Sequence, residues 1–371
     1  MKLLLTCGGT AGHVYPAVAL ARVFQRHYQD CQVLFVGADG GMELKLVAQE
    51  GYPIATVTIS NFRRSLSPKQ WGHNLKSAWN VVHSRRQAAG ILKDFSPDLV
   101  VGTGGYASFP AVRQAARMGI PTAIHESNAS PGLTTRTLAK YVDLVMVGFE
   151  EAVKSYEDPS KVKVTGTPVR PDFFALTRQQ ARAKLGLTDD RPVVLSFWGS
   201  LGASVMNREM LDFMACWREE DMPFHHIHGA GRDYETMRQA LSGRGLEPKD
   251  FDLRQYIYDM PTVMAAADLV LCRAGASTLS ELTATGKPAI LVPSPNVTAN
   301  HQFKNAKVLS DRGGALLVEE KDCSGQKLYG MVQDLLADGA GRDRMSQAQL
   351  SLAVPTAAED IYQALMKRMG H

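Results

Sequence analysis

The chain has 371 residues, 45% of them hydrophobic, which is enough to bury two cores and too many for one typical domain. Its 41 basic and 37 acidic residues give a net charge of +4, too small by itself to indicate nucleic acid as a partner. Five cysteines without metal-ligand or disulfide-like spacing fit a reducing cytoplasm. No apolar run reaches the ~18 residues of a membrane-spanning helix, and residues 3–5 are too short for a signal-peptide core, so we expect neither anchor nor export signal.

Short aliphatic runs alternate with helical patterns along the whole chain, which predicts α/β architecture with parallel sheets. The expected strands are residues 3–6, 32–36, 54–59, 99–101, 122–124, 144–147 and 162–165, then 193–198, 224–227, 269–271 and 289–292. Both series begin with a hydrophobic strand that enters a glycine loop. We therefore expect two Rossmann-like domains facing one another across a cleft, at residues 1–166 and 193–355, with a linker at 167–192. Thr356 to Glu359 reads as a capping box that opens a C-terminal helix over 357–369.

Residues 272–281, Cys-Arg-Ala-Gly-Ala-Ser-Thr-Leu-Ser-Glu, form the most informative stretch. They follow a strand and open a helix, so the first N–H groups of that helix can bind a phosphate, and Gly275 and Ala276 allow its close approach. Glu281 would then lie about one turn into the helix, where it can accept hydrogen bonds from a ribose. An ordinary capped helix, with Ser277 or Thr278 as N-cap and Glu281 as its capping-box partner, is an equally good interpretation of this stretch alone.

A second polar cluster follows the next expected strand. Residues 300–306 are rich in amides and include His301 and Gln302. Ligands of open α/β sheets bind beyond the carboxyl ends of the strands. One strand end suited to phosphate and another rich in hydroxyl-binding amides indicate a sugar attached to a diphosphate.

The first glycine loop, residues 8–13, ends in His13. Its spacing is not the G-x-G-x-x-G dinucleotide fingerprint, and no acidic residue ends the second strand, so an NAD-dependent oxidoreductase is disfavoured. A histidine at the start of a helix commonly does no more than cap that helix. Beside a glycine loop at a cleft it is also a candidate general base, because imidazole titrates near neutrality.

Two further polar turns follow strands of the first half. Gly102-Thr103-Gly104-Gly105-Tyr106 has three glycines in four positions, which indicates either a close approach to a ligand or a tight turn with Tyr106 packed on the core. His125-Glu126-Ser127-Asn128 also falls at a strand end, and Glu126 is a second, weaker candidate for the base. Arg170, near the expected linker, is placed to reach a phosphate or to hold an ion pair between domains.

Residues 61–93 contain seven basic side chains and no Asp or Glu. Helical spacing places apolar residues on one face there, with basic residues beside it. The alternatives are a core-facing helix with a solvated basic side, or a patch that binds an anionic bilayer. The residues of this membrane patch are Trp71, Leu75, Lys76, Trp79, Val82, Arg85 and Arg86.

Together and in this order, these motifs resemble the MurG family of bacteria, enzymes that add N-acetylglucosamine to lipid I and so make lipid II for peptidoglycan. The resemblance covers nearly the whole chain. The family patterns are GGTGGH at residues 8–13, GGY at 104–106, HExN at 125–128, NPVR at 167–170, GSxGA at 199–203 and RSGAxTxSE at 273–281.

The resemblance implies a glycosyltransferase of the GT-B type, with a final helix, 356–371, that returns to the first domain. It implies an inverting transfer from UDP-N-acetylglucosamine (UDP-GlcNAc) to the C4 hydroxyl of the N-acetylmuramic acid (MurNAc) of lipid I, at the cytoplasmic face of the membrane, in cell-wall biogenesis, cell shape and division. The donor would be bound by Thr10, Ala11, Gly12, Asn128, Arg170, Ser200, Ile257, Ala276, Ser277, Thr278, Leu279, Ser280, Glu281, His301 and Gln302. The acceptor pyrophosphate would face Gly9, Gly104, Gly105 and Tyr106.

The chain departs from the family pattern at four positions: Ala11 and Trp198 for glycines, Thr167 for asparagine and Asn300 for aspartate. No D-x-D-like carboxylate cluster is visible, so we expect a metal-free reaction without cofactors. Expected partners are UDP-GlcNAc, lipid I, an anionic inner-membrane surface and the cell-wall synthesis machinery, and no nucleic acid. The competing hypotheses are another UDP-sugar enzyme of the same fold, such as a UDP-GlcNAc 2-epimerase, and a non-catalytic UDP-sugar sensor.

Overall fold

The computed structural model describes residues 1–59, 83–199, 202–219, 222–246 and 251–370. They form two compact units, Met1–Arg170 with the C-terminal segment from Val354, and Pro171–Ala353. Each unit is an α/β fold built on one parallel sheet, as predicted. The division between residues 170 and 171 falls inside the segment that the sequence suggests as a linker.

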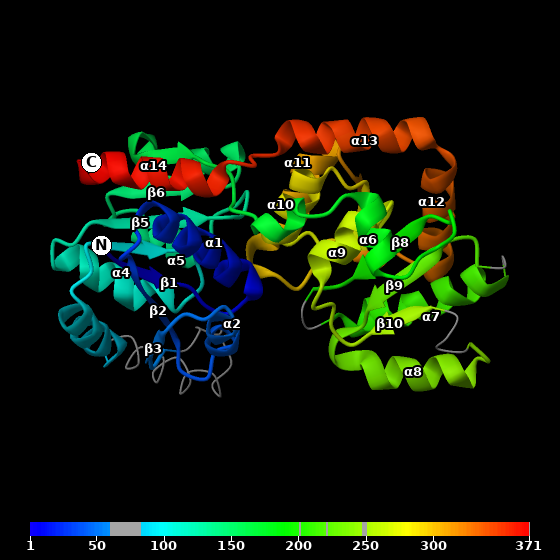
Figure 1. Cartoon of the computed structure of the whole chain (residues 1–371), viewed down its shortest axis with the longest axis horizontal. Coiled ribbons are helices and arrows are strands. Elements are labelled where there is room, and N and C mark those ends of the chain that lie inside the picture. The colour runs from blue at the N-terminus through cyan, green and yellow to red at the C-terminus, as the bar shows by residue number, and fades with distance from the viewer. Residues whose placement is uncertain (60–82, 200–201, 220–221, 247–250, 371) are drawn as a thin grey trace. The chain divides into compact units, whose positions relative to one another are not determined.

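The first unit contains a parallel sheet in the order β3-β2-β1-β4-β5-β6-β7 (Figure 1). Its strands are β1 Lys2–Thr6, β2 Gln32–Ala38, β3 Ile54–Val57, β4 Leu99–Gly102, β5 Thr122–Glu126, β6 Leu144–Val147 and β7 Val162–Val164. Its helices are α1 Ala11–His27, α2 Glu43–Gln49, a helical stretch at 83–95, α4 Ser108–Arg117, α5 Leu133–Leu138, η1 Glu150–Ser155, η2 Pro159–Lys161 and α14 Ala357–Met369.

Apolar side chains cover both faces of this sheet, because successive residues of a strand point to opposite sides. Leu3 and Leu5 of β1 are buried in one core with residues of α1 and α14. Leu4 between them is buried in the other core, with Val100 of β4 and residues of α4. A sheet buried on both faces explains why its strands are continuous aliphatic runs rather than alternating ones.

The C-terminal helix α14 packs against α1 across more than 300 residues of sequence, and Figure 1 shows the two helices side by side. Tyr362 meets Phe24 edge-on at 5.0 Å between ring centroids and stacks on His27 at 4.0 Å. The helix bounds are those predicted, but the capping box is wrong. The hydroxyl of Thr356 donates to Asp360, and Glu359 pairs with His27 at 2.8 Å, so neither side chain caps the helix.

The second unit repeats the plan with a parallel sheet in the order β10-β9-β8-β11-β12-β13. Its strands are β8 Val193–Phe197, β9 His225–Gly229, β10 Asp252–Arg254, β11 Leu269–Cys272, β12 Ala289–Leu291 and β13 Leu316–Leu317. Its helices are η3 Pro171–Phe174, α6 Arg178–Lys184, α7 Ser204–Glu219, η4 Gly231–Asp233, α8 Tyr234–Gly243, α9 Met260–Ala266, α10 Ala276–Thr285, η6 Thr298–Asn300, α11 His301–Asp311, η7 Glu320–Asp322, α12 Gly325–Ala337 and α13 Gly339–Leu352.

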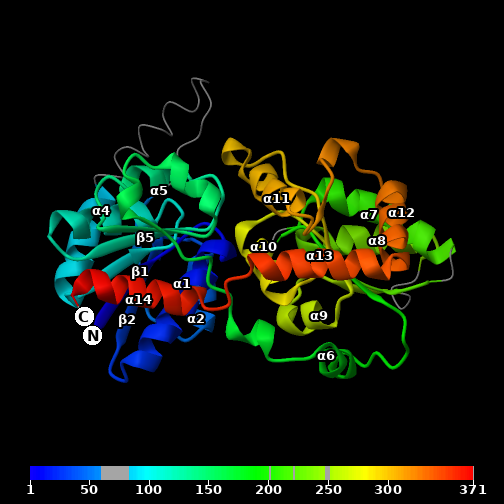
Figure 2. The ribbon, with the colours of Figure 1, turned by 90° about the horizontal axis from the view of Figure 1, so that it is seen from above.

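Two strands of this sheet, β10 and β13, were not predicted. β13 has only two residues, and in β10 a single leucine stands between Asp252 and Arg254, so that it is no aliphatic run. Helix α13 runs alongside α10 (Figure 2). The contact is close where α10 ends, because Gly286 has a left-handed backbone and a Cβ there would lie 2.8 Å from Leu350. Only glycine fits this turn without strain.

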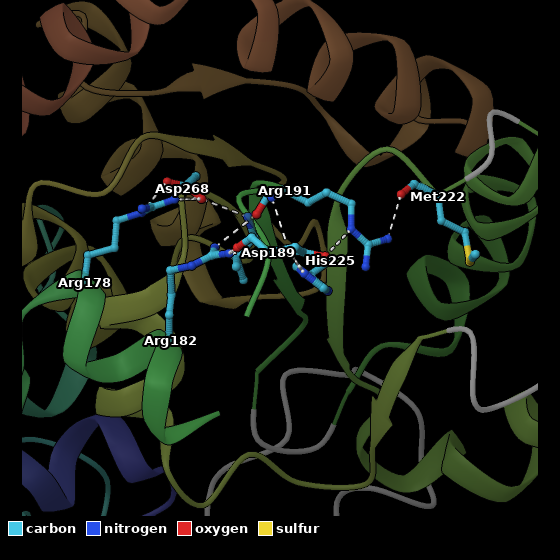
Figure 3. A network of polar contacts seen from close by, with 8 residues as sticks. Arg178, Arg182, Asp189, Arg191, Met222, His225 and Asp268 are labelled. Carbon is cyan, nitrogen blue, oxygen red and sulfur yellow. Dashed lines mark hydrogen bonds and ion pairs between the residues drawn. The ribbon is translucent and has the colours of Figure 1, made fainter. Parts of the chain in front are cut away.

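The expected linker is largely a structured part of the second unit. Ala181 of α6 is buried against Ala265 and Ala266 of α9. Figure 3 shows the polar contacts that fix α6 at the amino ends of the strands: Arg178 binds Asp268 through two hydrogen bonds of 2.8 and 2.9 Å. Asp189 accepts hydrogen bonds from His225 and Arg191, which together lower its pKa to about 2.

Candidate functional sites of the two units

In the first unit the strand order reverses between β1 and β4, and the two glycine loops follow these two strands. Ligands of doubly wound sheets bind at this switch point, beyond the carboxyl ends of the strands. The loops touch: a Cβ on Gly105 would lie 2.0 Å from the carbonyl oxygen of Gly8, and Gly105 has a φ of +81°. The second loop also holds the first turn of α1, since the hydroxyl of Thr103 donates to the carbonyl of His13 at 2.7 Å. The predicted acceptor residues Gly9, Gly104, Gly105 and Tyr106 therefore lie together, with the Tyr106 ring beside Gly9.

His13 is the third residue of α1 and is held by the loop before it. Its Nδ1 lies 2.7 Å from the carbonyl oxygen of Gly8 and 3.3 Å from the hydroxyl of Thr10. A carbonyl only accepts hydrogen bonds, so Nδ1 carries the proton and the neutral ring has its lone pair on Nε2. A Cβ on Gly104 would lie 3.0 Å from Nε2, so glycine at 104 keeps this edge of the ring open. The hydrogen bond therefore fixes the orientation of the ring and leaves Nε2 as its acceptor atom.

The donor residues expected on this loop, Thr10, Ala11 and Gly12, form the N-cap and first turn of α1. The substitution of alanine for the family's glycine at 11 is accommodated, because Ala11 has helical backbone angles and no positive φ. Arg170, at the end of this unit, lies over the ring of Tyr15 of the same helix, 4.5 Å from its centroid.

Glu43 was not singled out by the sequence, yet it holds the first glycine loop. Its carboxylate is completely buried and accepts hydrogen bonds from the N–H groups of Gly9, at 3.2 Å, and Ala38, at 2.8 Å. The sequence signal for Glu43 was a single acidic residue at the start of an amphipathic stretch. An acidic residue there is also typical of the first turn of an ordinary helix.

Glu126 is engaged within its own loop. One carboxylate oxygen accepts from the main-chain N–H and side-chain amide of Asn128, at 3.0 and 2.8 Å, and the other accepts from Gly132 N–H, at 2.9 Å, and from Thr135. The side chain is 5% exposed. Next to it, His125 donates from Nε2 to the carbonyl of Gly166 at 2.9 Å, and burial lowers its pKa. These contacts order the loop that carries Asn128.

In the second unit the order reverses between β8 and β11, so the loops after these strands are neighbours. Helix α10 begins at Ala276 with Gly275 as N-cap; no side chain caps it, and its first turn has no acidic residue. The capped-helix interpretation of this stretch is therefore wrong. Ser277 and Thr278 lie in the first turn, Ser280 donates to Ala276 O at 3.0 Å, and Leu279 is fully buried, so that it can meet a ligand only through its main chain. Glu281 lies one turn further, near enough to Cys272 to add to the effect of burial in raising the pKa of that thiol.

Arg273 and Trp198 form the base of this site. Trp198, which replaces a glycine of the family pattern, is 3% exposed and belongs to the core of the second unit, so it fills space beneath the loop. The guanidinium of Arg273 lies over its ring, 5.9 Å from the centroid. Arg273 also donates to the carbonyl of Val292, at 3.0 Å, and pairs with Glu320. Arg273, which follows β11, thus contacts residues that follow β8, β12 and β13.

The amide cluster begins α11, which follows the next strand, β12. Asn305 donates to the carbonyl of Ala274 at 3.2 Å and thereby ties α11 to the loop before α10. His301 donates from Nδ1 to Thr298 O at 2.9 Å, and Gln302 accepts from Ser294 N–H at 2.9 Å. Asn300 has a left-handed backbone, φ 51°, a conformation that asparagine tolerates. The structure thus brings the two predicted polar clusters of this unit together.

Ile257, which follows β10, is buried, and its side chain lies 3.2 Å from where a Cβ on Gly229 would be. Ser200 and the membrane-patch residues Trp71, Leu75, Lys76, Trp79 and Val82 fall outside the described residues. Of that patch, the structure describes Arg85, which is half-buried, and Arg86, which is exposed, on a helical stretch that buries Ala88 and Leu92. Within the described parts of the chain, no helix is long and apolar enough to span a membrane, and no group of three or more His, Cys, Asp or Glu is arranged to hold a metal ion.

The chain matches known proteins over its full length. Residues 3–147 match the glycosyltransferase family 28 N-terminal domain, and residues 193–361 match its C-terminal domain. A protein of Desulforamulus reducens is 38% identical over 371 residues, covering 99% of this chain and 98% of its own, and one of Acetivibrio thermocellus is 39% identical over 366 residues, covering 98% and 97%. Both are named UDP-N-acetylglucosamine--N-acetylmuramyl-(pentapeptide) pyrophosphoryl-undecaprenol N-acetylglucosamine transferase. The chain belongs to the MurG family.

Solved structures agree with this assignment. MurG of Acinetobacter baumannii is 27% identical, with a TM-score of 0.73 and 99% of each chain covered. A UDP-GlcNAc 2-epimerase of Neisseria meningitidis also matches, with a TM-score of 0.68, but at 15% identity it shows the shared fold alone. The predicted GT-B fold and the MurG resemblance are confirmed, and membership of the MurG family makes the chain an N-acetylglucosaminyltransferase.

Proposed function

We propose that this enzyme transfers N-acetylglucosamine from UDP-GlcNAc to the C4 hydroxyl of the MurNAc of lipid I, with inversion at the sugar carbon, and so forms lipid II. The observation that carries the proposal is the pair of switch-point sites, one in each unit, in a chain that aligns end to end with MurG enzymes. One site has an oriented imidazole, as an acceptor hydroxyl needs. The other has an uncapped helix N-terminus, as a leaving diphosphate needs.

The donor is assigned mainly to the second unit. The first N–H groups of α10, with Ser277 and Thr278, bind the diphosphate, and the carboxylate of Glu281 accepts hydrogen bonds from the ribose hydroxyls. The main chain of Ile257 meets uracil, and His301 and Gln302 bind the sugar. The helix N-terminus is pre-organised for negative charge, so it stabilises the diphosphate as the bond to the sugar breaks.

In the first unit, His13 acts as the general base. The hydrogen bond from Nδ1 to Gly8 leaves Nε2 to take the proton of the C4 hydroxyl while that oxygen attacks C1 of the donor sugar. Glu126 is the weaker candidate, because both of its oxygens already accept hydrogen bonds from its own loop. We assign Glu126 to positioning Asn128, and the glycine loops to the acceptor pyrophosphate.

Lipid I is held in a bilayer, so the enzyme must work at a membrane surface. The basic segment at 61–93 supports peripheral binding to anionic lipid at the cytoplasmic face, next to other proteins of cell-wall synthesis.

Incubation with labelled UDP-GlcNAc and a lipid I analogue tests the proposal. The expected result is a labelled disaccharide on the lipid and one UDP released for each transfer. Release of UDP without any acceptor would instead indicate an epimerase. Binding of UDP-GlcNAc without turnover, across several acceptors, would indicate a sensor.

A further inference from the structure

A chain of buried polar side chains lies beneath the donor-side loops of the second unit. Ser196 of β8 and His226 and His228 of β9 are at most 2% exposed. The hydroxyl of Ser196 lies 2.8 Å from Nε2 of His226 and 2.7 Å from Nδ1 of His228. Nε2 of His228 lies 3.2 Å from the amide oxygen of Asn207 in α7. None of these residues has a role in the proposed chemistry.

Asn207, at one end of this series of hydrogen-bonded side chains, fixes the direction of every hydrogen bond in the series. The NH₂ group of Asn207 donates to the carbonyl of Ala230, at 2.8 Å, and to Asp233, at 2.9 Å, so its oxygen faces His228. That oxygen only accepts, so His228 donates from Nε2 and accepts at Nδ1. Ser196 must then donate to His228 and accept from Nε2 of His226. The hydrogen bonds therefore run one way, from His226 to Asn207.

This direction requires the imidazole of His228 to be neutral, because its Nδ1 accepts a hydrogen bond, and burial favours the neutral ring. Burial lowers the pKa of His228 to about 3 and the pKa of His226 well below its usual value. At the far end, Nδ1 of His226 has no hydrogen-bond partner among the described residues, and the rings of Phe213, Trp217 and Phe224 surround it. Burying the acceptor Nδ1 of His226 without a hydrogen-bond partner costs free energy. Stability alone therefore does not explain these buried side chains.

Asn207, at the other end of the hydrogen-bonded series, lies where three loops of the second unit meet. Ala230 and Gly231 follow β9, and their N–H groups donate to the carbonyls of Arg254 and Gln255, at 2.9 Å each, just before Ile257. Gly202, in the loop after β8, packs so closely on Ala230 that a Cβ there would lie 2.5 Å from its carbonyl oxygen. This is the carbonyl that accepts from Asn207. The amide of Asn207 thus holds the loop after β9, and that loop in turn contacts the loops after β8 and β10.

We propose that His228, acting through Asn207, is a positioning residue for the UDP part of the donor, because it holds these three loops in one arrangement. Resting on the proposed function, this assigns a role in donor affinity to a side chain that touches no substrate. The loop after β10 leads to Ile257, whose main chain is assigned to uracil.

Two substitutions separate the hydrogen bond from the volume of the ring. In His228→Gln the side-chain amide reaches the place of Nε2 and can still donate to Asn207. In His228→Asn the shorter amide reaches only the place of Nδ1, so the link to Asn207 is lost. His27→Asn is the matched control, because His27 lies in the first unit and is paired with Glu359.

Isothermal titration with UDP and with UDP-GlcNAc is the first measurement, at a temperature where every variant is folded by circular dichroism. We expect His228→Asn to weaken binding about tenfold, equivalent to about 1.4 kcal/mol and within the range for one lost hydrogen bond. His228→Gln and His27→Asn should stay within about threefold of the wild type. In the transfer assay, the KM for UDP-GlcNAc should rise by the same factor while the KM for the lipid acceptor does not.

Hydrogen exchange of the ligand-free protein is the second measurement. The amides of Ala230 and Gly231 should exchange faster in His228→Asn and at the wild-type rate in His228→Gln. A lower melting temperature of His228→Asn with unchanged UDP affinity and unchanged exchange overturns the proposal and leaves a purely structural histidine. Equal losses of affinity in both variants also overturn it, because ring volume would then be what matters.

If His228→Asn does not fold, Asn207→Ala answers the same question from the other side of the hydrogen bond. It removes the amide that donates to the carbonyl of Ala230 and should weaken UDP binding about tenfold, as His228→Asn does; wild-type affinity in that variant overturns the proposal. Failure of the proposed function is recognised separately in the wild type, which would then form no disaccharide on any acceptor, whatever the affinities of the variants. The wild type could also bind no UDP-GlcNAc at all. That result overturns both.

Discussion

The Nδ1 atom of His13 is joined to the carbonyl of Gly8 by a 2.7 Å hydrogen bond, so the residue that opens the glycine loop sets the tautomer of the histidine that follows it. The bond places the lone pair on Nε2, beside Gly104. An inverting transfer needs a base for the acceptor hydroxyl, and we propose His13 for this role because its Nε2 is left as the acceptor.

We therefore expect His13→Ala to lower kcat by about 10²–10⁴-fold, the usual contribution of a general base, with little change in UDP affinity. Activity of the wild type should fall at acid pH, where an imidazole is protonated, and the variant should lack this fall. Steady-state rates from pH 5 to 9 check both points. His27→Ala, at the other end of α1, is the control; a His13 variant that keeps the acid limb and most of its turnover would remove His13 from the chemistry.

Glu281→Ala should weaken UDP binding by about 1.5–3 kcal/mol, the scale of a hydrogen bond to a charged group. Stability should hardly change, because α10 begins at Gly275 and Ala276, so that Glu281 has no capping role. Calorimetric titration with UDP and a thermal melt decide this, with the exposed Glu235→Ala of α8 as control. A lower melting temperature with unchanged UDP affinity would contradict the ribose assignment.

Gly105→Ala should disrupt the acceptor site. The new Cβ would overlap the carbonyl of Gly8, and the backbone φ of +81° adds strain of about 1–3 kcal/mol for a non-glycine residue. Turnover should fall steeply while UDP affinity, which depends on the second unit, stays the same. Gly119→Ala is the matched control: its φ is +73°, but nothing lies within 4 Å of the added Cβ, so it tests strain alone. Equal turnover in the two variants would mean that contact between the loops is unimportant.

Reversing the charge of Lys76, Arg85 and Arg86 to glutamate should release the enzyme from vesicles that contain anionic lipid, since each basic residue near such a surface contributes about 1 kcal/mol at low salt. Co-sedimentation with vesicles, with and without anionic lipid, measures this. The same reversal at the exposed Lys307, Lys321 and Arg344 of the second unit should leave binding intact. If both triple variants sediment like the wild type, the segment is a solvated basic face.

Acid should destabilise the second unit through its buried histidines. The pKa of His228 is about 3 in the folded protein and about 6.5 in an unfolded chain, so the unfolded state binds the proton more readily. The stabilising effect of the neutral ring is complete above about pH 6.5 and is lost as the pH falls toward 3, by up to about 1.4 kcal/mol per pH unit in that window. Urea unfolding midpoints at pH 7.5, 6 and 5 should fall less steeply for His228→Gln than for the wild type. Parallel curves would show that the pKa of His228 is the same in the folded and the unfolded state.

The aliphatic runs and the glycine turns determined much of the fold in advance. Most strands were found from sequence within one or two residues, because strands buried on both faces need unbroken Val, Ile and Leu. The glycines at 104, 105 and 286 also mark turns that only glycine adopts, which a sequence records directly. The sequence did not reveal β13, which has two residues, or β10, in which Asp252 and Arg254 interrupt any aliphatic run. It also did not reveal α6, whose polar residues suggested a linker although Arg178 and Ala181 anchor it to the second unit.

The sequence by itself determined which residues follow the strands, because aliphatic runs and glycine turns are local patterns, and the loops that follow parallel strands all lie at the carboxyl edge of the sheet. Only the tertiary structure decided what those residues are free to do. It showed that Glu126 is fully occupied by Asn128, Gly132 and Thr135, that Thr356 and Glu359 form no capping box, and that Trp198 belongs to the core. It also joined Ser196, Asn207 and His228 into one hydrogen-bonded chain. Hydrogen bonds between residues far apart in sequence depend on where strands and helices meet, and no local pattern encodes that.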